Sequence, residues 1–236
     1  MAVKECKDKE FTNEVAFRLI PSKYPPIALF DDVADEEEFA ALYAIQELTN
    51  PRIQNELGNL TLVDPSEIPF GIAGCSYAVA PFVHISGDGG RFNDAQFGAF
   101  YCAENMETAI SEVSYHQVRY LNNIENCPFE VITYRGLECQ FTAKLKDLTS
   151  LPMEHDVYSK SHYSAGQQIA RELKQSGSDG VTYFSVRARK PEEVCFALFA
   201  PRLIQRIVQT AHFESFYSNG AITKFEKVSP CNAEQD

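Results

Sequence analysis

The segment Gly89-Gly90-Arg91-Phe92-Asn93, followed by the apolar run FGAFYCA at residues 97–103, decides how the middle of this chain folds. The apolar run is short and lies behind a glycine pair, which is typical of a buried strand. Asn105 then offers a helix cap, and Met106, Ile110 and Val113 recur at helical spacing. The stretch therefore predicts a turn, a buried strand and a helix in immediate succession.

Polar side chains are placed at the ends of these expected elements. Arg91 leaves the glycine turn, Tyr101 lies near the end of the strand, and Glu112 falls on the second turn of the helix. Thr108, Glu112 and His116 are four residues apart and share one helix face. An arginine, a tyrosine and a carboxylate in this arrangement suit a polar pocket for an anionic, sugar-containing ligand.

Strands outnumber helices in the rest of the chain, and many follow one another directly. Apolar runs predict strands at 15–20, 129–134, 137–143, 181–186, 194–199, 204–210 and 221–228, the second and third lying on either side of Arg135-Gly136. Helices are predicted over 31–48, 51–57 and 163–175, while 75–80 fits a helix or a strand. This order predicts an α+β fold with mixed or antiparallel sheets and packed helices. No Gly-x-Gly-x-x-Gly motif opens a strand–helix unit, which argues against a doubly wound parallel sheet.

Composition narrows the class of protein. The 236 residues are 44% hydrophobic, enough for a substantial core, and carry a formal charge of −12. Such an acidic chain is poorly suited to binding nucleic acid through phosphate contacts. Its seven cysteines are irregularly spaced and form no Cys-x-x-Cys pair, which favours reduced thiols over disulfides or a zinc site. With a charged N-terminus and no apolar stretch of about 20 residues, the chain is expected to be soluble and cytoplasmic.

Four motifs together resemble a known family. Gly-Gly-Arg-Phe-Asn (89–93), Tyr-Cys-Ala-Glu (101–104), Glu-Thr-Ala-Ile-Ser-Glu-Val (107–113) and Asp-Gly-Val-Thr-Tyr-Phe-Ser-Val-Arg (179–187) look like the RES domain, named for its Arg, Glu and Ser. The resemblance runs from about residue 17 to residue 201, and it implies a fold similar to ADP-ribosyltransferase toxins.

The resemblance also suggests how the chain is divided. We expect one catalytic domain at 14–228 between a charged, frayed tail at 1–13 and a second tail at 229–236. Residues 27–83 exceed what the compact family core needs, and we interpret them as a helical insertion.

The resemblance implies a toxin of a toxin–antitoxin pair that consumes NAD, as substrate and without a metal. Cleavage of the nicotinamide–ribose bond by hydrolysis or phosphorolysis is the leading expectation. Transfer of ADP-ribose to a protein is the alternative, and an inactive RES-fold binding module is the second alternative. The family's usual partner is an Xre-type antitoxin that carries a helix-turn-helix. We therefore expect a complex with such an antitoxin or a homo-oligomer, with no direct binding to nucleic acid or membrane.

Breaking this bond passes through an oxocarbenium-like transition state, as glycoside cleavage does. A nearby negative charge, a clamp on the pyrophosphate and an apolar wall all favour it. With the resemblance, these needs suggest the catalytic residues. Glu112 would stabilise the cation, Arg91 would hold the pyrophosphate or a ribose, and Tyr101 would stack on nicotinamide or hydrogen-bond a ribose.

A second set of residues is expected to bind NAD: Arg18, Tyr24, Asn93, His116 and Ser185. Each also has an ordinary structural interpretation, such as a strand-edge charge for Arg18 or a structural histidine for His116. Ser185 could donate to a ribose hydroxyl or to the nicotinamide amide. No general base is expected beside it, so nucleophilic serine catalysis is not predicted. Gln168 is a further candidate to line the pocket.

Overall fold

The computed structural model describes residues 3–23, 35, 37–41, 44, 58–125, 127 and 129–230. The predicted α+β fold is confirmed. Its strands are β1 (Asp8–Pro21), β2 (Phe100–Ala103), β3 (Phe129–Asp147), β4 (Gly180–Phe184), β5 (Val194–Leu198), β6 (Ile204–Ser218) and β7 (Ala221–Pro230). The α-helices that lie within the described residues are α3 (Cys75–Val83), α4 (Met106–Leu121) and α5 (Ser164–Gln175). Short 3₁₀ turns occupy Val3–Glu5, Leu60–Leu62, Pro65–Glu67, Leu148–Ser150, Asp156–Tyr158 and Pro201–Leu203.

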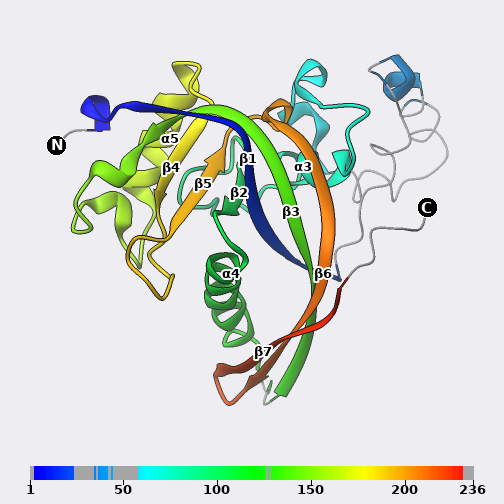
Figure 1. Cartoon of the computed structure of the whole chain (residues 1–236), viewed down its shortest axis with the longest axis vertical. Helices are drawn as coiled ribbons and strands as arrows, with labels where there is room; N and C mark the ends of the chain where they lie inside the picture. The colour runs from blue at the N-terminus through cyan, green and yellow to red at the C-terminus, as the bar shows by residue number, and fades with distance from the viewer. Residues whose placement is uncertain are drawn as a thin grey trace.

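The seven strands form one mixed sheet in the order β1-β2-β5-β4-β3-β6-β7, and β1 also pairs with β3. The pairings of β1, β2, β5, β4 and β3 therefore close on themselves. Among the described pairings, β3–β4 is parallel and the others are antiparallel. Figure 1 shows the long strands β1, β3 and β6 bending together across the molecule, with α4 beside them.

Helix α4 is fixed to this sheet by its apolar face. Met106, Ile110 and Val113 pack against a cluster built from β1, β3 and β6, which includes Tyr134 and Phe213. The helix begins where the sequence predicts, because the Asn105 side chain accepts a hydrogen bond from the backbone N–H of Thr108. Because the apolar face of α4 packs against the sheet, the face that carries Glu112 does not contact this cluster.

The predicted break at Arg135-Gly136 is wrong. Strand β3 runs through these residues, and only its register against β6 shifts between Gly136 and Leu137. A Cβ on Gly136 would lie 2.6 Å from the Phe213 ring and 3.0 Å from the Met106 methyl group. The glycine is therefore needed for the close approach of α4 and β6 to β3, and does not mark a turn.

Other expectations meet mixed outcomes. The helix predicted over 163–175 is α5, the segment 75–80 is helical, and the two last strands pair as β6 and β7. The interpretation of 1–13 as a frayed tail is wrong from Asp8 onward, because Asp8 begins β1 and its carboxylate pairs with the Lys146 ammonium at 2.5 Å. The second expected tail is likewise wrong for 229–230, which belong to β7.

The expected helical insertion can be followed only in part. Residues 37–41 and 44 are helical, and the described stretch 58–83 holds 3₁₀ turns and α3. The remainder of the helix predicted at 31–48, and all of that at 51–57, lies outside the described residues. Within the described part of the chain, no helix is both long enough and apolar enough to cross a bilayer.

Candidate active site

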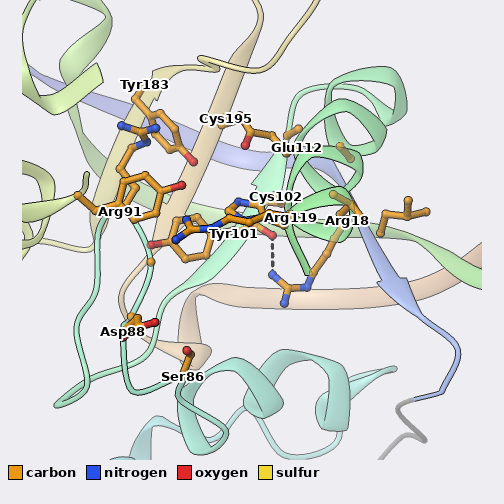
Figure 2. A pocket seen from close by; sticks show the side chains of 18 of the residues that line it. Arg18, Ser86, Asp88, Arg91, Tyr101, Cys102, Glu112, Arg119, Tyr183 and Cys195 are labelled. Atoms are coloured by element: carbon orange, nitrogen blue, oxygen red, sulfur yellow. Dashed lines mark hydrogen bonds between the residues drawn. The ribbon is translucent and has the colours of Figure 1, made fainter. Parts of the chain in front are cut away.

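A pocket of about 840 Å³ lies between α4, the β1–β2 edge, the loop 86–91 and the start of α5. It receives side chains from segments that are far apart in the sequence (Figure 2). Its polar and aromatic wall includes Arg18, Asp88, Arg91, Tyr101, Glu112, His116, Arg119, His162, Tyr163, Gln167 and Tyr183. Five of the residues expected from the sequence therefore line one cavity: Arg18, Arg91, Tyr101, Glu112 and His116.

The glycine turn sets the position of Arg91. Gly89 has a φ of 66°, and a Cβ there would lie 2.3 Å from the backbone oxygen of Asn93. The Gly90 N–H donates to the Asn93 backbone oxygen and to its side-chain oxygen, both at 3.0 Å. A residue with a side chain would be strained at Gly89 and would open this turn.

Arg91 is buried, and its guanidinium is held from several sides. Its Nη1 donates to the backbone oxygens of Val157 at 2.6 Å and Ser159 at 2.9 Å. The guanidinium also lies 4.8 Å from the centre of the Tyr163 ring. Gly166 in α5 packs against the backbone of Arg91, leaving no space for a Cβ. One nitrogen of the expected pyrophosphate clamp is therefore already occupied by the protein.

The Tyr101 hydroxyl is occupied as well. It donates to the Asn93 side-chain oxygen and accepts from the Phe92 N–H, both at 2.8 Å. Burial raises the pKa of Tyr101 well above its usual value. The Tyr101 ring lines the pocket. Asn93 is buried and does not line the pocket, so its side chain orients Tyr101. A stacking role for Tyr101 fits this arrangement better than a hydrogen bond to ribose, and Asn93 is placed to act through Tyr101.

Arg18 lies on the opposite side of the same tyrosine. Its Nη1 donates to the Tyr101 backbone oxygen at 2.7 Å, the bond drawn as a dashed line in Figure 2. Its guanidinium also lies 4.8 Å from the centre of the Phe100 ring. Burial lowers the pKa of Arg18, but arginine remains a cation in proteins. Arg18 therefore supplies positive charge to the pocket while bonding the backbone near the start of β2.

The carboxylate of Glu112 is held by Ser185. The Ser185 hydroxyl donates to Glu112 Oε1 at 2.5 Å, and it accepts from the N–H groups of Arg187 at 3.1 Å and Ala188 at 2.9 Å. Burial raises the pKa of Glu112, while the Ser185 hydrogen bond and the charges of Arg91 and Arg187 oppose that rise. Ser185 is buried and does not line the pocket. Its hydroxyl therefore acts by holding the Glu112 carboxylate.

Two more contacts attach the β4–β5 loop to α4. The Thr108 hydroxyl donates to Glu193 at 2.5 Å, and the Arg187 guanidinium lies 3.4 Å from the centre of the Tyr115 ring. Thr108 is fully buried. These contacts keep the distance between Ser185 and Glu112 fixed, because each joins the same loop to the same helix.

His116 lies at the pocket mouth, one turn beyond Glu112. The surrounding protein and then the charges of Arg187, Arg119 and Arg91 lower its pKa. The residue is nevertheless exposed, so solvent limits these effects. The direction of the shift favours a neutral imidazole at neutral pH.

Several pocket residues were missed from the sequence. Arg119 is seven residues beyond Glu112 on the same helix face, so helical spacing alone could have identified it. The prediction that Gln168 lines the pocket is wrong, because Gln168 is exposed and donates to Glu172. Its neighbour Gln167 lines the pocket and donates to the backbone oxygens of Asp88 and Gly90. No local sequence pattern marks Tyr163 or Tyr183 as a pocket residue. The expected ligand-binding residue Tyr24 lies outside the described residues.

The chain is similar to a known protein family, to a bacterial protein and to a solved structure. The family model of the RES domain matches residues 68–218, more than half of the chain, and this range includes Arg91, Glu112 and Ser185. The protein y4oC of Sinorhizobium fredii, described as uncharacterized, is 26% identical over 208 residues, which cover 88% of this chain and 84% of that protein. A chain of the Mycobacterium tuberculosis MbcT–MbcA toxin–antitoxin complex aligns with a TM-score of 0.47 and 13% identity over 88% of each chain.

Proposed function

Because this chain belongs to the RES domain family, we propose that it is an NAD-consuming toxin of a toxin–antitoxin pair, and that it cleaves the nicotinamide–ribose bond. The observation that carries the proposal is the Glu112 carboxylate, held by Ser185 in a pocket that also contains three arginines. An anion beside a cationic cavity suits a substrate that is anionic at its pyrophosphate and becomes cationic at its ribose.

The proposed chemistry needs little from the protein beyond placement and charge. Nicotinamide is already a good leaving group, so its departure requires no general acid. As the bond breaks, positive charge develops on the ribose, and a fixed carboxylate lowers the energy of that state. The Tyr101 and Tyr183 rings provide aromatic surface for nicotinamide. The pocket volume lies within the range of sites that enclose small molecules.

The attacking group decides the product. Water gives ADP-ribose, phosphate gives ADP-ribose-1-phosphate, and a protein side chain gives an ADP-ribosylated protein. All three capture the same cation, so the placement of Glu112 suits each of them. We favour hydrolysis or phosphorolysis in the cytoplasm, with an Xre-type antitoxin as the partner that keeps the enzyme inactive.

The test combines chemistry in vitro with growth. Purified protein is incubated with NAD, with NAD and phosphate, and with NAD and cell lysate, and nicotinamide and its co-products are measured. Release of nicotinamide supports the proposal, and the co-product identifies the acceptor. Expression without a partner should arrest growth and lower NAD.

A matched control makes the growth experiment specific. Glu112→Gln should abolish the arrest, whereas Glu107→Gln, on an exposed position of the same helix, should not. Soluble wild-type protein that releases no nicotinamide and permits normal growth would instead support an inactive binding module.

A further inference from the structure

We propose that Arg119 is the residue that holds the substrate's diphosphate, and that it thereby makes the pocket specific for a dinucleotide. This inference rests on the proposed function and deepens it. The position lies outside the four motifs that carry the family resemblance, whose helix motif ends at Val113.

The other two arginines of the pocket are committed to the protein. Arg91 gives its Nη1 to two backbone oxygens and stacks on Tyr163, and Arg18 bonds the Tyr101 backbone oxygen and stacks on Phe100. These contacts fix the guanidinium planes and use part of their donor capacity. Each still contributes charge, but its guanidinium is held in place by the protein.

Arg119 differs from both. It is exposed, lines the pocket, and makes no hydrogen bond, ion pair or ring contact with any described residue. With respect to the described residues, all five of its N–H donors therefore remain for a ligand. Figure 2 shows its side chain pointing from α4 into the cavity. A free guanidinium presents the planar pair of donors that matches phosphate oxygens.

The spacing along α4 suits the geometry of NAD. Seven residues separate Glu112 from Arg119, which is about 10 Å along a helix. Helical side chains lean toward the N-terminus, which directs a side chain at position 119 toward the turn nearer Glu112. In NAD, one ribose separates the diphosphate from the bond that breaks. With Glu112 beside that ribose, the diphosphate falls within reach of Arg119.

His116 lies between these two residues on the same helix face. Burial by the surrounding protein, and then the charges of Arg187, Arg119 and Arg91, lower the pKa of His116. A neutral His116 leaves Arg119 as the cation of this face at neutral pH. Asp88 is the other pocket carboxylate, and it lies on the loop below the site in Figure 2.

The experiment compares wild type with Arg119→Gln, Arg119→Lys and the control Arg206→Gln, an exposed arginine of β6 outside the pocket. Titration with ADP-ribose measures diphosphate binding directly and requires no turnover. We expect Arg119→Gln to weaken ADP-ribose binding about 10- to 100-fold, the range of a charged hydrogen-bonding group. Arg119→Lys should recover part of this loss, because it keeps the charge but not the planar pair of donors.

Kinetics separate recognition from damage to the site. Arg119→Gln should raise KM for NAD and leave kcat within about threefold, because a diphosphate contact is the same before and during bond cleavage. Inhibition by free nicotinamide, which has no phosphate, should be unchanged. Unaltered ADP-ribose binding in Arg119→Gln, or an equal loss of ADP-ribose and nicotinamide binding, overturns the inference. If wild type binds ADP-ribose but cleaves no NAD, the proposed function fails while the titration still decides the role of Arg119.

Discussion

Replacement of Glu112 by Gln tests the electrostatic role on which the proposed mechanism depends. The amide keeps the shape of the side chain and an oxygen that can accept from the Ser185 hydroxyl, now at 2.5 Å from Glu112. Only the charge is removed. Substrate binding should therefore change little, while the transition state loses the anion that stabilises its cationic ribose.

The magnitude follows from the interaction of two charges. A unit pair about 4 Å apart interacts by about 4 kcal/mol at an effective dielectric constant of about 20. The ribose carries only part of a charge in the transition state, and Glu112 is partly open to solvent. About 3 kcal/mol then remains, which corresponds to roughly a hundredfold in rate.

Nicotinamide release measured by chromatography gives kcat, and calorimetric titration with NAD gives the affinity. We expect kcat to fall at least about a hundredfold with little change in affinity. The same variant should be more stable than wild type at neutral pH. Burial raises the pKa of Glu112 in the folded state, so ionisation costs stability above the ordinary glutamate pKa, and that cost disappears with the charge. A kcat within about threefold of wild type refutes the electrostatic role.

Three further predictions concern the surroundings of the site. Ser185→Ala removes a donor that favours ionised Glu112, so the pKa of Glu112 should rise and the acid side of the pH–rate profile should move to higher pH; an unmoved profile contradicts this coupling. Thr108→Val deletes the buried bond to Glu193 and should lower the free energy of unfolding by about 1–3 kcal/mol, measured by denaturant titration, and an unchanged midpoint would count against the contact. The isolated protein, with its net charge of −12, should not retard duplex DNA in a gel at physiological salt, and a shifted band would disprove this expectation.

Local physics made the centre of the site predictable. Asn105 caps α4 through a bond to a residue three positions on, and the apolar and polar faces of that helix follow from residue spacing alone. The alignment of Glu112, His116 and Arg119 along one face has the same origin. The turn at Arg91 is also local, since the Gly90 N–H donates to Asn93 and Gly89 supplies the positive φ. Such contacts join residues a few positions apart, so the sequence by itself determines them.

The partners of those side chains depended on the tertiary structure. Ser185 reaches Glu112 across 73 positions, Arg18 reaches the backbone of Tyr101 across 83, and Arg91 reaches Val157 across 66. The contact between Arg18 and Tyr101 follows from the pairing of β1 with β2, whereas the other two join loop, turn and helix residues that lie outside the strands.

The role of Gly136 likewise depends on the tertiary structure and does not follow from the local sequence. It resembles a turn in sequence but accommodates Phe213 and Met106 in the fold. Periodicity reports which face of an element is buried, whereas the contacts across that face are set by segments that meet only when the whole sheet has formed.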